Sequence, residues 1–286
     1  MATEVWEDEA QAPPWDAERA SLDARARSEL DRCAAVDRVI AAMHERIDRP
    51  FALDEMAHIA YLSRFYFNRV FREVTGLPPV RFHTALRIAG AKRMLVTTDL
   101  SVTEVCLEVG YQSLGTFTTH FHELVGVSPR EFRRAASATA SVPAGLADAL
   151  ARAQSASGAP AVEGDLLGAP EAEPAFVGLF RQPYPHGLPF ACTVVDGSGR
   201  YELHVDARGS FHVAATAFAA DERPALVAVT RRPVRLAPGR TSRRDLRLRP
   251  VRRTDPPILL ALPRMSSARE NGGRPMSDQH RRAFAD

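Results

Sequence analysis

Apolar residues recur at helical spacing along the first half of the chain. Leu53, Met56 and Ala60 share one face of a short helix, and a second helix with a polar, basic outer face follows it. Gly76 stands where a glycine commonly ends a helix. Read in this way, the pattern predicts helices over 36–47, 53–60, 63–75, 79–97, 102–109 and 113–125, and a final short one from 128.

The second half changes to short apolar runs that alternate with polar residues. A period of two predicts β-strands, and the sequence DGSG at 196–199 is typical of a turn between two of them. Several short strands separated by turns predict an antiparallel β-sandwich, so the expected fold class is multidomain, all-α followed by all-β. The predicted strands cover 176–180, 190–195, 200–205, 211–217, 225–229 and 243–248.

Shifts in composition divide the chain. The stretch between the two halves is rich in Ala, Ser, Gly and Pro, which predicts a linker with one candidate helix near 144–154. The expected organisation is an acidic flexible segment (1–31), a helical domain (32–136), a linker (137–172), a β-sandwich (173–253) and a C-terminal tail (254–286).

The helical half contains an internal repeat at an offset of 50 residues. Seven identical residues, including aromatics, glycine and proline, coincide under this shift, which indicates two copies of one helix-turn-helix unit. Glu104 follows Ser101, and Glu131 follows Ser128, at the spacing of a capping box, and Ser63 and Ser113 are candidate caps. The matching pairs are Tyr61/Tyr111, Ser63/Ser113, Phe67/Phe117, Phe71/Phe121, Gly76/Gly126, Pro79/Pro129 and Phe82/Phe132.

Charge is distributed unevenly, although the formal net charge is only +2. Residues 1–31 carry nine acidic and three basic residues, whereas 64–93 carry seven basic residues and one acidic residue. A basic segment of this kind suits a polyanionic partner. No apolar run approaches the roughly 20 residues of a membrane span, and the N-terminus lacks the pattern of a signal peptide. Three cysteines far apart in the sequence are expected to be free thiols in a reducing cytosol. We therefore expect a cytoplasmic protein without a membrane partner.

Three stretches resemble the AraC/XylS family of transcription regulators: SRFYFNRVFREVTGLPP, RFHTALRIAGAKRML and LSVTEVCLEVGYQSLGTFTTHFHELVGVSPREFRR. The resemblance implies two helix-turn-helix units joined by a long helix, and a double-stranded promoter or operator as the partner. It also implies that the outer faces of the two second helices contact DNA. These faces carry Arg64, Phe65, Asn68, Arg69 and Arg72 in the first unit, and Leu114, Gly115, Thr118, Thr119 and His122 in the second.

The chemistry of these residues suggests a division of labour. Asparagine and arginine can make bidentate contacts to adenine and guanine, so Asn68 and Arg69 are expected at bases, with Arg64 and Arg72 at phosphates. Surface ion pairing is the alternative reading of these charges. From 101 to 134 four acidic residues exceed three basic ones, and Thr119 stands where the family usually has arginine. The first unit is therefore expected to dominate affinity.

The β-rich part resembles a carboxypeptidase regulatory-like, transthyretin-like sandwich in GRYELHVDARGSFHVAATAF and APGRTSRRDLRLRP. It carries no catalytic constellation, so no enzyme, cofactor or metal is expected, and the HxxE pattern of His120 and Glu123 falls within a recognition helix. Ten arginines against one aspartate in 231–253 leave surface solvation or a second DNA-backbone contact open.

The leading hypothesis is therefore a sequence-specific transcription regulator that uses adjacent major-groove segments. The family usually places its DNA-binding domain after a sensing domain, and here the order is reversed. RNA polymerase, and a small-molecule or protein effector at the sandwich, are open partners. The alternative hypothesis is a ligand- or partner-binding sandwich protein whose helical domain binds DNA weakly.

Overall fold

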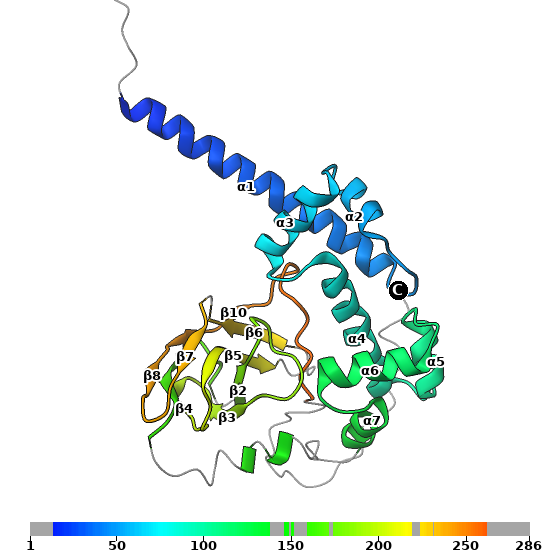
Figure 1. The fold of residues 1–286 in the computed structure, drawn as a ribbon, viewed down its shortest axis with the longest axis vertical. Helices are drawn as coiled ribbons and strands as arrows, with labels where there is room; N and C mark the ends of the chain where they lie inside the picture. Colours follow the sequence, from blue (N-terminus) through cyan, green and yellow to red (C-terminus); the bar gives the residue numbers. More distant parts are fainter. Residues whose placement is uncertain are drawn as a thin grey trace, which may run out of the picture.

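The computed structural model describes residues 14–137, 146–148, 150–151, 159–171, 174–218, 224–230 and 232–261. A helical domain comes first and a β-rich module follows, and the two lie side by side (Figure 1). The predicted division into an α half and a β half is confirmed. The helices are α1 (Pro14–Glu45), α2 (Leu53–Ile59), α3 (Arg64–Thr75), α4 (Pro79–Thr97), α5 (Val102–Glu108), α6 (Leu114–Val125) and α7 (Pro129–Ser137).

The first helix is longer than its sequence pattern predicts. The apolar spacing indicates a helix only over 36–47, because the preceding residues are too polar to show a buried stripe. In the structure α1 begins at Pro14 and projects from the body of the molecule (Figure 1). Residues 14–31, expected as part of a flexible acidic segment, are therefore helical.

Local capping chemistry sets several helix ends. Ser101 and Glu104 form the predicted capping box at α5, with Glu104 Oε2 accepting from the Ser101 backbone N–H at 2.7 Å. The equivalent bond joins Glu131 to the Ser128 N–H at 2.8 Å. Ser113 Oγ accepts from the backbone at the start of α6, but Ser63 at the start of α3 makes no side-chain cap bond.

The two helix-turn-helix units differ by one residue in the turn. The second helices α3 and α6 are 50 positions apart, whereas the first helices α2 and α5 are 49 apart. The left-handed backbone position is Tyr61 in the first turn and Gly110 in the second. Tyr61 is consequently 81% exposed, whereas Tyr111 is only 8% exposed. The sequence match between these two tyrosines does not reflect an equivalent structural role.

Each unit has its own hydrophobic core. Phe67, Phe71 and Phe82 lie in the first, and Phe117 and Phe121 lie in the second. The paired phenylalanines of α3 and α6 form edge-on or tilted contacts at 5.5 and 5.7 Å between ring centroids. The central helix α4 contributes to both cores, so the predicted apolar stripes are indeed buried.

The β-module contains two sheets. The first has the order β4-β1-β8, with β9 also pairing with β1, and the second has the order β10-β6-β5-β2-β3, with β7 pairing with β5. A hydrophobic core lies between them. The strands are β1 (Val162–Leu167), β2 (Pro174–Phe180), β3 (Ala191–Asp196), β4 (Gly199–Leu203), β5 (Gly209–Phe218), β6 (Pro224–Val229), β7 (Val234–Leu236), β8 (Ser242–Arg243), β9 (Leu246–Arg247) and β10 (Arg249–Pro250).

Two expectations about the β-module need correction. Strand β1 falls inside the predicted linker, and it pairs in parallel with β8 and β9, so the module is not wholly antiparallel. The predicted strand at 243–248 is split between β8 and β9. At the break the Arg244 carbonyl lies against Gly164, where any side chain on Gly164 would overlap it. Next to it, Asp245 Oδ1 accepts a hydrogen bond from the Asp165 N–H at 3.0 Å.

The outer face of the second sheet is also covered. Phe176, Phe180 and Cys192 pack there against Leu146 and Leu260. The tail was expected to begin at 254, yet Leu259, Leu260 and Ala261 are buried. The candidate helix near 144–154 is helical where the structure describes it, at 146–148 and 150–151.

Candidate nucleic-acid interface

Helix α3 presents one buried and one exposed face. Its hydrophobic residues Phe67, Val70 and Phe71 are inaccessible to water. The spacing that buries this stripe leaves the opposite face in solvent. All five predicted contact residues of the first unit are exposed: Arg64, Phe65, Asn68, Arg69 and Arg72.

Loose ion pairs occupy two of the arginines on this face. Arg64 Nε lies 3.6 Å from Asp54 Oδ1, and Arg69 Nε lies 3.8 Å from Glu73 Oε1. Both pairs are exposed, and such pairs contribute little because water and salt screen them. Asn68 and Arg72 have no hydrogen-bond or ion-pair partner among the described residues. These side chains can therefore exchange solvent for phosphates or bases at small cost.

The outer face of α6 is less polar and uncharged. Leu114, Gly115, Thr119 and His122 are exposed, and Thr118 is half-buried. The Thr118 hydroxyl donates to the Leu114 carbonyl at 2.8 Å, which holds the hydroxyl against its own helix. This face can supply hydroxyl, imidazole and van der Waals contacts, but no permanent positive charge.

His120, part of the HxxE pattern, contacts Tyr111 in the core of the second unit. Its Nδ1 lies 3.2 Å from the Tyr111 hydroxyl, and the two rings make an edge contact at 5.8 Å. Among the residues that the structure describes, no group of three or more His, Cys, Asp or Glu could hold a metal ion. None of the described helices is long and apolar enough to cross a membrane.

Helix α4 positions the two units against each other. Arg87 Nε donates to the Ile47 carbonyl at 2.9 Å, and the Arg87 guanidinium also lies over the Tyr111 ring of the second unit at 5.6 Å. Gly90 allows a close approach, because a Cβ there would lie 3.3 Å from Ile47 and 3.7 Å from Val109. One face of α4 thus joins the end of α1 to the turn of the second unit.

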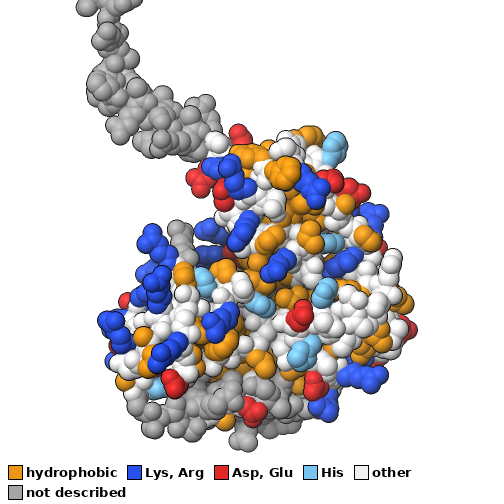
Figure 2. Space-filling view, viewed as in Figure 1, with side chains coloured by type: hydrophobic (Ala, Val, Ile, Leu, Met, Phe, Trp, Pro, Cys, Tyr) orange, Lys and Arg blue, Asp and Glu red, His pale blue; other side chains and the backbone are white. Residues whose placement is uncertain are grey.

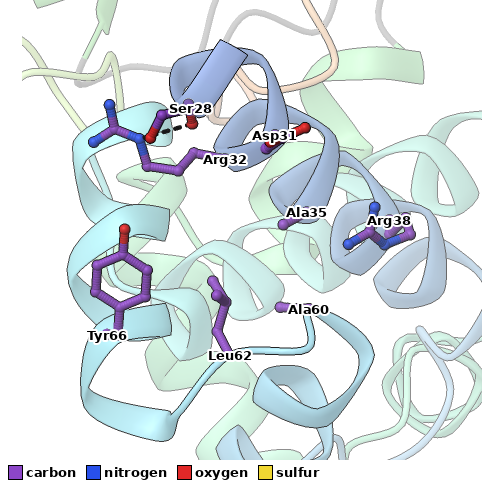
Figure 3. Close-up of a pocket in the computed structure, with 8 residues that line it drawn as sticks. All are labelled: Ser28, Asp31, Arg32, Ala35, Arg38, Ala60, Leu62 and Tyr66. Atoms are coloured by element: carbon purple, nitrogen blue, oxygen red, sulfur yellow. Dashed lines mark hydrogen bonds between the residues drawn. The ribbon is translucent and has the colours of Figure 1, made fainter. Parts of the chain in front are cut away.

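Sequence reasoning missed an open cleft beside α3, between α1 and the first turn (Figure 3). Arg32 in this cleft donates to the Ser28 carbonyl at 3.2 Å and lies 3.8 Å from Glu73 of α3. The packing of α1 on α3 creates the cleft, so no local sequence pattern could reveal it. Its lining residues are Ser28, Asp31, Arg32, Ala35, Arg38, Ala60, Leu62 and Tyr66.

The arginine run of the β-module is partly neutralised. Arg243 pairs with Asp165, and Arg249 forms two 2.7 Å bonds with Asp255. On the face shown in Figure 2, basic side chains gather over the β7–β8 edge of the module. Arg232, Arg235, Arg240 and Arg247 are exposed and have no acidic partner within the described residues.

The helical domain is similar to known proteins. The helix-turn-helix domain family matches residues 56–135. The HTH-type transcriptional regulator GbdR of Pseudomonas aeruginosa (strain UCBPP-PA14) is 30% identical over 96 residues, which are 34% of this chain and 26% of that protein. The melibiose operon regulatory protein of Escherichia coli (strain K12) is 27% identical over 99 residues, 35% of this chain and 33% of that protein.

Residues 56–135 of the helical domain are thus a helix-turn-helix domain similar to those of transcriptional regulators. The chain spans between 26% and 39% of the length of the most similar curated relatives. The β-module lies outside the matched residues 56–135. The predicted resemblance to AraC/XylS regulators is thus confirmed for the domain that carries the repeat.

Two solved structures are similar to the helical domain. One is the DNA-binding domain of AdpA in complex with a target DNA, with 35% identity and a TM-score of 0.34 over 35% of this chain and 90% of that one. The other is a transcriptional regulator with an AraC-type DNA-binding domain from Chromobacterium violaceum, with 25% identity, a TM-score of 0.34 and the same two coverages.

Proposed function

We propose that this protein is a transcription regulator that binds double-stranded DNA through α3 and α6. The observation that carries the proposal is that α3 and α6 both pack on α4 and both expose their outer faces. The 19 residues of α4 extend about 28 Å, close to the roughly 34 Å between successive major-groove segments on one side of B-DNA. Of the curated relatives named above, one is a transcriptional regulator and the other an operon regulatory protein.

In this proposal α3 provides most of the affinity. Arg72 and Arg64 contact phosphates, and Asn68 and Arg69 reach base edges, because these exposed side chains of α3 carry suitable hydrogen-bond donors. Helix α6 contributes shape and weaker polar contacts. Its Thr118 hydroxyl is already engaged, so base contacts there fall mainly to Thr119 and His122.

The β-module is the second part of the proposal. Its two-sheet architecture is compatible with a transthyretin-like sandwich, and it is the part available to an effector or to RNA polymerase. The exposed, unpaired arginines of 232–247 suit a further contact to the DNA backbone. A second candidate function, in which this module binds a ligand and the helical domain has weak DNA affinity, is favoured by the lack of positive charge on α6.

In vitro selection from a random duplex library, with the purified full chain, tests the first proposal. We expect enrichment of one motif, with affinity that falls steeply as salt increases because phosphate contacts release counterions. Arg72→Ala should reduce the slope of log K against log salt by about 0.9. Arg69→Ala should cost about 1–3 kcal/mol on the selected motif.

Two comparisons sharpen this test. The double variant Thr118→Ala/Thr119→Ala should weaken binding less than Arg69→Ala, and equal losses would contradict the predominance of α3. Arg208→Ala removes an exposed arginine of the β-module outside the 231–253 run and should leave affinity unchanged. Failure to enrich any motif, together with a ligand-induced rise in melting temperature of the full chain, would favour the second candidate function.

A further inference from the structure

The segment 258–261, here termed the strap, is inserted between the two domains. Its alternate side chains point in opposite directions. Ile258 and Leu260 pack on the outer face of the second sheet, whereas Leu259 and Ala261 lie in the core of the second helix-turn-helix unit. Figure 1 shows this C-terminal segment, in orange, running between the sandwich and the helices. Burial on both sides makes the strap a continuous part of two cores.

Polar bonds fix the strap to the helical domain. Lys92, the single lysine of the chain, donates from Nζ to the Leu260 carbonyl at 2.7 Å. The same ammonium lies 5.4 Å from the centre of the Phe132 ring, a cation–π distance. Because Lys92 belongs to α4, the strap is anchored on the helix that both units share.

A second segment of the β-module, 184–188, contacts both units. Tyr184 is buried in the core of the first unit and stacks on His186 at 4.2 Å. The Gly187 N–H donates to the Leu124 carbonyl at 2.6 Å, at the end of α6. Leu188 lies so close that a Cβ on Gly126 would be 2.8 Å from its Cγ. One loop therefore joins the first core to the second recognition helix.

The strap and this loop also bind each other. The Leu259 N–H donates to the Pro185 carbonyl at 3.1 Å, and His186 and Leu259 form a parallel bridge. Together they form one body, 184–188 with 258–261, which we term the brace. The brace touches the first core through Tyr184 and the second core through Leu259 and Ala261.

Since packed cores have fixed shapes, a body inserted in both cores restricts how the two units rotate about α4. We propose that the brace holds the two helix-turn-helix units in one relative orientation and so limits the spacing between the two half-sites that the protein accepts. The β-module then acts as a structural determinant of DNA specificity without touching a base. This inference rests on the proposed DNA-binding function.

Spacing is a sensitive measure of orientation. One added base pair moves a half-site by about 3.4 Å and rotates it by roughly 34° about the duplex axis. A rigid pair of recognition helices cannot follow this movement without losing contacts, whereas a loosely joined pair can. We therefore expect the wild-type protein to lose about 10-fold in affinity for each base pair inserted or deleted between the half-sites.

The experiment uses the motif selected by the wild-type full chain, with the half-sites moved apart or together by one and two base pairs. Leu259→Ala removes strap contacts from the second core, and Lys92→Met removes the bond to the Leu260 carbonyl while keeping most of the apolar stem. For both variants we expect the DNA affinity to fall less than about 3-fold for each base pair inserted or deleted. The discrimination is smaller because these variants bind the selected spacing more weakly than the wild-type protein does. Leu203→Ala is the matched control, because it makes the same truncation inside the sandwich core.

The outcomes separate the two proposals. If the wild-type protein enriches no motif, the proposed function fails and the brace has no DNA role. If the wild-type protein binds one spacing and both brace variants keep the same 10-fold discrimination, the brace proposal is overturned. If Leu259→Ala does not fold, as judged by its circular dichroism, Lys92→Met alone decides the question. Loss of discrimination in Leu203→Ala as well would also overturn a specific role for the brace.

Discussion

At the scale of single residues, burial has altered the protonation of His83 in helix α4. His83 is almost fully buried, its ring makes an edge contact with Phe51 at 5.8 Å, and its Nε2 has no hydrogen-bond partner among the described residues. Desolvation, and then the positive charge of Arg87, lower the pKa of His83 to about 4. The imidazole is therefore neutral in the folded protein at physiological pH.

This lowered pKa predicts acid sensitivity of the first unit. Between about pH 4 and pH 6.5 the unfolded chain binds a proton that the folded chain does not, so stability falls as the pH decreases through this range. We expect the unfolding free energy of wild type, relative to His83→Gln, to fall by roughly 2–3 kcal/mol between pH 7 and pH 4. Urea titrations at both pH values measure it, and a constant difference between the two proteins would contradict it.

At the scale of elements, the helices of the two helix-turn-helix units are stabilised partly by local capping bonds and partly by tertiary packing. Ser101 and Ser128 begin their helices with side-chain bonds that the sequence spacing predicts. Ser63 is the N-cap residue immediately before α3, yet its side chain makes no capping bond. Helix α3 is held instead by the buried face that includes Phe67 and Phe71.

This difference yields a paired prediction. Ser101→Ala should lower the unfolding free energy by about 1 kcal/mol, because the Glu104 N–H loses its acceptor. Ser63→Ala, the same truncation at the residue before α3, should cost less than half as much, since no side-chain bond is lost. Chemical denaturation of the full chain measures both variants. A larger loss for Ser63→Ala would show that its hydroxyl caps α3 in solution.

At the scale of the whole molecule, the contact between the domains partly buries the amino group of Lys92. Burial lowers the pKa of Lys92 to about 7, and the Leu260 carbonyl is the acceptor of its bond. Above this pH the amine can be neutral in the folded protein and still donate a hydrogen bond. The unfolded chain keeps its proton until about pH 10.5, so stability due to this group rises with pH between the two values.

The third prediction follows from this difference. On raising the pH from 7 to 9, the unfolding free energy of wild type should increase by roughly 2 kcal/mol relative to Lys92→Met, which has no group to titrate. Thermal or urea unfolding at the two pH values gives the comparison. Parallel pH profiles for the two proteins would mean that the ammonium is hydrated and that the strap does not enclose it.

The sequence by itself determined the repeat, the helices and most strands, because these depend on periodic burial and on short-range turn and cap chemistry. It also placed Asn68, Arg69 and their neighbours outside the buried stripe, which is why their exposure could be predicted. The role of α1, the parallel pairing of β1 and the position of 258–261 depended on contacts with residues far away in the chain. Only the tertiary structure decided those, since Ile258 to Ala261 carry no local signal that assigns alternate side chains to two different cores.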